Sequence, residues 1–301
     1  MVSHSTGMQY SHVLVPLDGS ERSTVALRTG HALASRLGAT VHTVSVATGP
    51  DVLAQLRLDA AAALNTASTD QRIHTVVGDD PVVAIAALAD ELGECIVCMS
   101  THAHDRFAGA VVESAARGLI QLQGRPVVMI GPLADRPLYM GEVWAEPLAG
   151  DRVVVCVDRD SSHHDVDDGS FPDESSALVG IAAYWAHLLG MSLTILAVAV
   201  PVISLAGIND TDALNDWLAG LATRGSAHDI DIDVHVEVDP VGTVEGIRSY
   251  LAAHPSGLLV VSTHARGGID RLVHGATAAG ITAASTIATL VVPLPPQGDH
   301  T

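Results

Sequence analysis

A short motif that occurs twice constrains the fold of this chain more than any other feature. The tetrapeptide Ser-Thr-His-Ala occupies residues 100–103 and again residues 262–265. Upstream of each copy, a run of branched aliphatic residues ends in an aspartate, Asp18 in one half and Asp158 in the other. Downstream, each copy leads through an alanine-rich stretch into a last apolar run. Repetition of this kind indicates one structural module that is used twice.

The length agrees with two modules. The 301 residues have room for two domains of about 150 residues, which is close to the commonest domain size. We expect domains at residues 1–135 and 151–301, with a linker at 136–150 that contains proline and glycine.

Short apolar runs alternate with segments of helical periodicity in both halves. Strands are predicted at 12–17, 40–46, 72–77, 95–99, 127–130, 152–157, 192–198, 232–237, 258–261 and 290–293. Helices are predicted at 25–37, 52–64, 81–91, 112–122, 176–189, 212–224 and 241–253. Short apolar strands between helices are typical of parallel sheets that are buried on both faces. The pattern therefore predicts an α/β fold.

The charge of the chain excludes some partners. The formal net charge is −19, with only 15 Lys and Arg residues, whereas binding to nucleic acid depends on cationic side chains. An anionic membrane surface is disfavoured for the same reason. The apolar stretch 191–208 is interrupted by Pro201 and is interpreted as a buried strand that runs into a loop. Since no secretory signal is visible at the N-terminus, we expect a cytoplasmic protein.

Two of the three cysteines, Cys95 and Cys98, have the spacing of a redox-active or zinc-binding pair. Cys95 and Cys98 lie three residues apart in a predicted strand, so their side chains point to opposite faces of the sheet. We interpret both, and Cys156 in the second half, as small buried apolar residues.

Two further groups of residues suggest chemistry without establishing it. His102 and His264 each follow a serine by two residues, but no nucleophile elbow accompanies them, so loop histidines are favoured over a hydrolase site. The insertion at 160–174 contains His163, His164 and several aspartates. These are suitable metal ligands, although a mobile acidic loop accounts for the same composition.

Together, the repeated tetrapeptide, the aspartate after each first strand and the strand order resemble the universal stress protein family, in particular its tandem-domain members. The resemblance implies that each domain has a mainly parallel five-stranded sheet sandwiched by helices, similar to adenine-nucleotide hydrolases. Family members that bind ATP, with Mg²⁺ accompanying the nucleotide, have a pattern of three glycines and a hydroxyl after the fourth strand. The resemblance also implies an internal pseudo-dimer of the two domains and the option of a homodimer.

The second half preserves this pattern better than the first. By resemblance, its nucleotide would lie against Asp158, Val198, Ser262, Ala265, Gly275, Ala276 and Thr277. Gly275 stands at the third glycine position, and Thr277 supplies a displaced hydroxyl. Glycines at such places let backbone N–H groups approach phosphate oxygens.

The first half departs further from the pattern. Its corresponding residues are Asp18, Val46, Ser100, Ala103 and Ser114. Glu113 stands where the third glycine is expected, and its carboxylate would repel a triphosphate. Asp18 before a turn is also an ordinary helix-capping arrangement.

We expect a non-enzymatic, stress-linked regulatory or binding protein with degenerate ATP sites, the second better preserved than the first. An interaction scaffold that binds no nucleotide is the main alternative. An adenine-nucleotide hydrolase is the other alternative, which the absence of a pyrophosphatase loop after the first strand disfavours.

Overall fold

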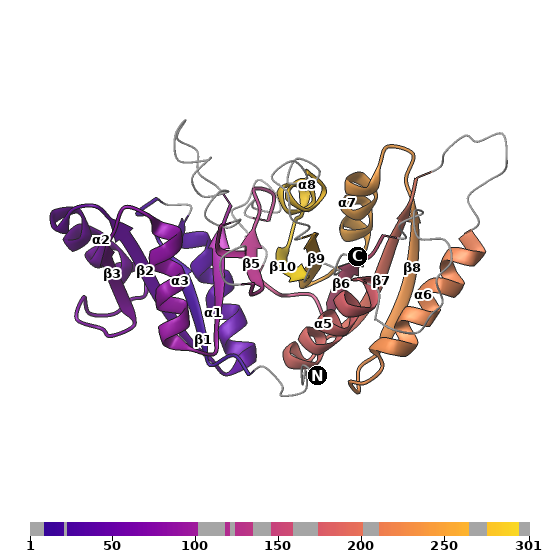
Figure 1. Ribbon diagram of the computed structural model, residues 1–301, viewed down its shortest axis with the longest axis horizontal. Coiled ribbons are helices and arrows are strands. Elements are labelled where there is room, and N and C mark those ends of the chain that lie inside the picture. The colour runs from indigo at the N-terminus through magenta and orange to yellow at the C-terminus, as the bar shows by residue number, and fades with distance from the viewer. Residues whose placement is uncertain are drawn as a thin grey trace, which may run out of the picture. The chain divides into compact units, whose positions relative to one another are not determined.

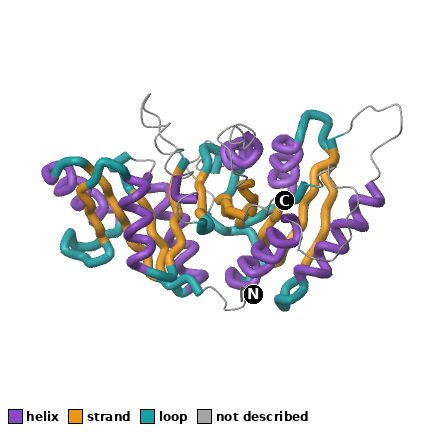
Figure 2. The backbone as a smooth tube through the Cα atoms, viewed as in Figure 1, coloured by secondary structure: helices purple, strands orange, loops and turns teal. Residues whose placement is uncertain are grey.

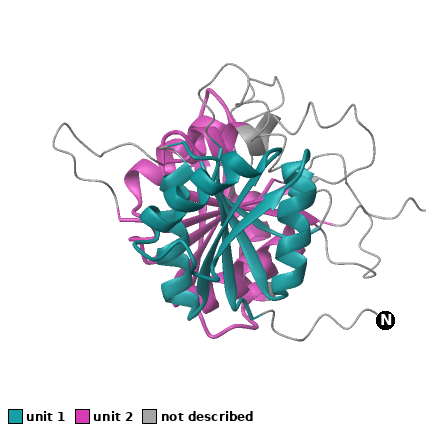
Figure 3. Cartoon of the chain, turned by 90° about the vertical axis from the view of Figure 1, so that its left-hand side faces the viewer, with its two compact units in different colours: residues 1–130 teal, residues 131–301 magenta. Residues whose placement is uncertain are grey.

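The computed structural model describes residues 9–20, 23–101, 118–120, 124–134, 146–158, 174–200, 211–264 and 276–294. The chain divides into two compact units, Met1–Ile130 and Gly131–Thr301 (Figure 3). Each unit alternates strands and helices along the chain (Figures 1 and 2), as the periodicity predicts.

The first unit contains five strands in the order β3-β2-β1-β4-β5, and each neighbouring pair is parallel. The strands are β1 (His12–Pro16), β2 (Thr40–Ala47), β3 (Ile73–Val77), β4 (Cys95–Ser100) and β5 (Val127–Ile130). The helices are α1 (Ser23–Leu37), α2 (Pro50–Ala63) and α3 (Pro81–Leu92).

The second unit repeats this topology with the order β10-β9-β6-β7-β8, again with parallel pairs. Its strands are β6 (Arg152–Cys156), β7 (Ser192–Ala199), β8 (Ile232–Val238), β9 (Leu258–His264) and β10 (Ala288–Leu294). Its helices are α5 (Glu174–Leu189), α6 (Thr211–Gly225), α7 (Thr243–Ala253) and α8 (Ala276–Ala284). The predicted α/β fold with a parallel five-stranded sheet in each half is thus confirmed.

Local chemistry explains where several helices begin and end. Asp80 caps α3 by accepting hydrogen bonds from the backbone N–H groups of Val82 and Val83, at 2.8 and 3.3 Å, and Pro81 occupies the first turn. Helices α1 and α5 are followed by Gly38 and Gly190, whose φ angles are +67° and +64°. Glycine adopts this left-handed conformation without a steric penalty.

Several predicted boundaries differ from the observed ones by two or three residues, and two of these differences have a clear cause. Helix α7 begins at Thr243 rather than residue 241, because the Asp239 carboxylate accepts hydrogen bonds from the backbone N–H groups of Val241 and Gly242 and so forms a turn there. Strand β9 continues to His264 rather than ending at residue 261, because β10 pairs with it as far as Leu294. For the predicted helix 112–122, residues 118–120 are helical, and the others lie outside the described residues.

The interpretation of the cysteines as buried residues is confirmed for Cys95 and Cys98, whereas Cys156 is half-buried. Cys95 and Cys98 are buried, and all three cysteines are free thiols. Burial raises the pKa of the Cys95 and Cys156 thiols to about 12, and it also raises the pKa of Cys98. These thiols are therefore packing residues. The stretch after Met191 forms β7 as predicted, and within the described ranges no helix has the length and apolarity needed to cross a membrane.

Candidate functional site

Each unit has one place where crossover connections leave in opposite directions along the sheet. In the first unit this switch point lies between the neighbouring strands β1 and β4, and in the second between β6 and β9 (Figure 1). Ligands of open parallel sheets bind outside the carboxyl ends of the strands at such points. Asp18 follows β1 and Ser100 ends β4, whereas Asp158 follows β6 and Ser262 lies in β9. The topology therefore brings these predicted residues to the two switch points.

The Asp18 carboxylate is engaged in a local turn. One of its oxygens, Oδ1, accepts hydrogen bonds from the Ser20 backbone N–H at 2.9 Å and from the Ser20 hydroxyl at 2.6 Å. The Ser20 carbonyl in turn accepts from the Ser23 N–H and hydroxyl at the start of α1. Gly19 between them has φ +82°, which the turn requires. Asp18 thus stabilises the entry into α1 in this structure.

The space beside this turn is small. A cavity of about 40 Å³ lies between the turn, Ser45 of β2 and helix α2. The Leu56 side chain of α2 lines it, and its Cδ2 lies only 2.8 Å from where a Cβ on Gly19 would be. A cavity that accepts benzene measures about 150 Å³, and adenine is larger than benzene. The pocket next to Asp18 therefore has no room for a base.

Two other predicted residues of the first half are described. Val46 is half-buried in β2, and its Cγ1 lies 3.7 Å from where a Cβ on Gly78 would be. Ser100 is buried at the end of β4 and is in register with Ile130 of β5. Ala103 and Ser114, together with Glu113, lie outside the described residues.

The corresponding carboxylate in the second unit is arranged differently. Asp158 is exposed, and its backbone carbonyl accepts a hydrogen bond from the Ser175 hydroxyl at 3.5 Å. Among the described residues, no side chain or N–H group donates to its carboxylate.

The remaining residues of the second half are partly described. Val198 packs against α7, with its Cγ1 2.6 Å from where a Cβ on Gly246 would be. Ser262 is half-buried and in register with Val292. Ala276 and Thr277 form the first residues of α8, whose N-terminus carries a positive partial charge. The predicted residues Ala265 and Gly275 lie outside the described part of the chain.

Sequence reasoning missed Leu56, which decides the size of the first pocket. Its residue type and its place in an amphipathic segment are unremarkable, and only the packing of α2 across the end of β2 brings it to Gly19. The alternative metal site at His163 and His164 lies outside the described residues, as does the side chain of His102. Elsewhere, in the ranges that are described, no group of three or more potential ligands could hold a metal ion.

Comparisons with known proteins agree with this topology. The model of the universal stress protein family matches residues 9–131. A solved universal stress protein from Archaeoglobus fulgidus DSM 4304 superimposes with a TM-score of 0.56 at 18% identity, covering 98% of this chain and 99% of its own. A functionally unknown protein from Pseudomonas aeruginosa PAO1 gives a TM-score of 0.58 at 18% identity, covering 96% of this chain and 95% of its own.

Two other results complete the comparisons. A universal stress protein solved in complex with cAMP covers 48% of this chain and 98% of its own, at 20% identity and a TM-score of 0.37. The comparison with curated proteins found no match. Residues 9–131 therefore match the universal stress protein family, and the whole length of the chain shares the fold of solved universal stress proteins.

Proposed function

We propose that this protein is a stress-response binding protein that takes up one adenine nucleotide per chain, in its second unit, and that it is not an enzyme. The observation that carries the proposal is the contrast between the two aspartates that follow the first strand of each unit. Asp18 accepts two hydrogen bonds from Ser20 beside a small cavity, whereas the carboxylate of Asp158, which is exposed like Asp18, accepts none from the described residues. The match of residues 9–131 to the universal stress protein family supports the nucleotide and the link to stress.

The first unit disfavours a nucleotide on two grounds. A base that entered beside Gly19 would have to displace Leu56. A ribose hydroxyl that bonded to Asp18 would compete with the two hydrogen bonds from Ser20, and the charge-assisted bonds of a carboxylate are worth about 1.5–3 kcal/mol each when formed to a good partner. The first unit is thus proposed to serve as an interaction module.

The second unit combines features that suit a nucleotide. Asp158 offers an acceptor to a ribose hydroxyl or an adenine amino group, and β7 ends nearby in the sheet, since β6 and β7 are paired neighbours. The N-terminal turn of α8 offers backbone N–H donors and positive partial charge to phosphate oxygens. ATP with Mg²⁺ is the proposed ligand because the family resemblance implies it.

The test begins with the purified full chain. Protein is denatured, any released small molecule is identified by mass spectrometry, and ATP and ADP are titrated by calorimetry with and without Mg²⁺. We expect one nucleotide per chain, and we expect Gly275→Glu to abolish binding while the far-UV circular dichroism stays unchanged, because a carboxylate would then face the phosphates. Two sites per chain would contradict the closed first unit. No binding at millimolar ATP would instead establish the alternative, an interaction scaffold without a nucleotide.

A further inference from the structure

Three histidines from neighbouring strands form a hydrogen-bonded row in the first unit. The His12 Nδ1 atom lies 3.1 Å from the His42 Nε2 atom, and the His42 Nδ1 atom lies 3.1 Å from the His74 Nε2 atom. The ring centroids are 5.0 and 5.3 Å apart. The row therefore crosses β1, β2 and β3 and joins them through side chains.

The row runs obliquely across one face of the sheet. Leu14 pairs with His42, and Val44 pairs with His74, so each histidine is diagonal to the next. Helix α1 covers the opposite face, because its Gly30 contacts Val13 and Val15, which alternate with His12 and Leu14 along β1.

The middle ring is the least accessible of the three. His42 is 9% exposed, whereas His12 and His74 are half-buried at the ends of the row. A neutral imidazole donates through one nitrogen and accepts through the other. Neutral rings that share one orientation can therefore satisfy both contacts of His42. Two protonated neighbours cannot, because two N–H donors would then face each other.

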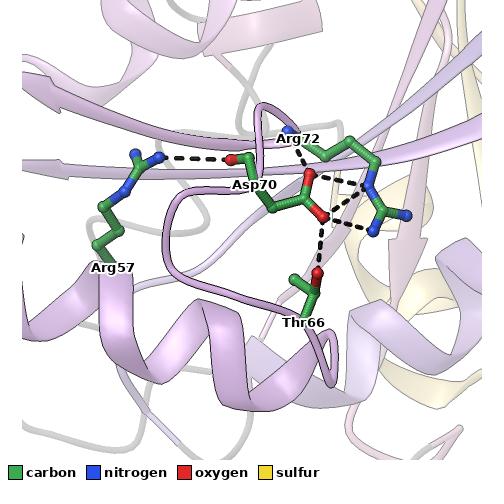
Figure 4. Close-up of polar contacts among 4 residues, drawn as sticks. All are labelled: Arg57, Thr66, Asp70 and Arg72. Carbon is green, nitrogen blue, oxygen red and sulfur yellow. Dashed lines mark hydrogen bonds and ion pairs between the residues drawn. The ribbon is translucent and has the colours of Figure 1, made fainter.

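Charged groups from the surrounding elements also act on the row. Arg72, at the start of β3, lies in a network with Asp70, Thr66 and Arg57 (Figure 4): its guanidinium bonds the Asp70 carboxylate at 2.6 Å, and the Thr66 hydroxyl donates to the same carboxylate at 2.8 Å. Arg57 of α2 donates to the carbonyl oxygens of Asp70 and Ile73.

The net effect of these groups disfavours a proton on the middle ring. Burial, followed by the neighbouring His74, His12 and Arg72, lowers the pKa of His42 to about 4, and Asp70 opposes this shift. Burial also lowers the pKa of His74, against the attraction of Glu91 in α3, and Arg57 adds to the lowering. Near neutral pH the buried part of the row is accordingly uncharged.

The second unit provides an internal contrast. Its pairing places Arg152, Thr194 and His235 at the positions of His12, His42 and His74, because Val154 pairs with Thr194 and Leu196 pairs with His235. Arg152 donates to the Tyr250 hydroxyl, His235 contacts Glu237, and the Thr194 hydroxyl is buried with no hydrogen-bond partner among the described residues. Among the described residues, the second unit therefore has no row of three imidazoles at the equivalent positions.

We propose that the His12–His42–His74 row is an acid-sensitive latch, which joins β1, β2 and β3 while its rings are neutral and loosens this part of the sheet when it takes up protons. The inference does not depend on nucleotide binding. A histidine that stays neutral in the folded state is protonated first in the opened state. Opening of the sheet therefore becomes easier as the pH falls below 6.5, the ordinary pKa of histidine.

The size of the effect follows from the same values. With a pKa of 6.5 when open and about 4 when closed, the opening constant attributable to His42 rises about 20-fold between pH 7 and pH 5. The opening constant of the second unit has no such contribution from Thr194.

The experiment is amide hydrogen exchange on the full chain at pH 7 and pH 5, followed peptide by peptide over β1–β3 and β6–β8. His42→Gln keeps a hydrogen-bonding side chain that does not titrate, and His187→Gln, at an exposed position on α5, is the matched control. Each variant is compared with the wild type at the same pH, so that intrinsic exchange rates cancel.

Lowering the pH from 7 to 5 should raise the exchange rate of β1–β3 by about 20-fold more in the wild type and in His187→Gln than in His42→Gln. In β6–β8 the three proteins should show no such difference. If His42→Gln does not fold, His42→Thr, which introduces the residue type of the second unit, takes its place. An equal acid response in the His42 variant overturns the proposal. A His42 ring that titrates at or above pH 6.5 by NMR overturns it as well.

Discussion

Exchanging the two equivalent aspartates for alanine, one at a time, separates a structural carboxylate from a ligand-binding one. Asp158→Ala removes an exposed carboxylate that accepts no hydrogen bond from the described residues. Its loss should leave the midpoint of urea unfolding within experimental error. A carboxylate bond to a ligand hydroxyl contributes about 1.5–3 kcal/mol, so the Kd for ATP should rise by about 10- to 150-fold.

Asp18→Ala should have the opposite pattern. It removes the acceptor of two hydrogen bonds from Ser20 at the entry of α1, and loss of such a cap costs about 1 kcal/mol. The free energy of unfolding of the first unit should fall by this amount while ATP affinity stays constant. Asp18→Asn, which keeps an Oδ1 acceptor, is the control and should recover most of the stability.

The measurements are calorimetry for ATP affinity and urea unfolding for stability. Both are made on the wild type, Asp158→Ala, Asp18→Ala and Asp18→Asn. The reasoning is refuted if Asp18→Ala weakens ATP binding as much as Asp158→Ala does, because the first unit would then contain a working site despite Leu56. It is equally refuted if Asp158→Ala binds ATP with unchanged affinity, because the carboxylate would then not face the ligand.

Two further predictions concern stability and reactivity. Asp80→Ala should destabilise the first unit by about 1 kcal/mol, because it deprives the Val82 and Val83 N–H groups of their acceptor. Asp80→Ser, measured by urea unfolding, should restore most of this stability. An unchanged unfolding midpoint for Asp80→Ala would contradict the role of Asp80 as a helix cap. A maleimide at pH 8 should not label the native protein and should react fully in urea with Cys95, Cys98 and Cys156. Burial raises the pKa of each thiol, and the thiolate is the reactive form. Rapid labelling of the native chain, detected by mass spectrometry, would show that these positions open.

The sequence predicts the elements well where local chemistry decides them. The predicted start of α3 at residue 81 and the predicted end of α1 at residue 37 agree with the structure, because a helix cap and a left-handed glycine act within a few residues of the chain. Two boundary errors have different causes, one in a distant segment and one in a local side chain. The length of β9 depends on its pairing with β10, and the start of α7 depends on a turn that the Asp239 side chain forms.

The candidate site is less accessible to sequence reasoning for a related reason. An aspartate after the first strand is compatible with both a ligand contact and a turn cap, since the same carboxylate can accept a bond from either. The geometry of Ser20 distinguishes the two roles for Asp18, and the packing of Leu56 against Gly19 closes the pocket. Neither fact follows from residue type, because each depends on how α1 and α2 lie over the ends of the strands.

The histidine row shows the same dependence at longer range. His12, His42 and His74 lie about 30 residues apart, and each is an ordinary strand residue by pattern. Only the parallel register places them diagonally on one face, and the second unit, with the same register, has Arg152 and Thr194 in two of the three places. The two units therefore share a backbone plan, while their side chains differ near both ends of the strands. At the carboxyl ends, Ser20 holds the Asp18 carboxylate beside a small cavity, which has no described counterpart at Asp158. Near the amino ends, the first unit has a row of imidazoles that can respond to pH, and the second unit has other residues at two of the three equivalent positions.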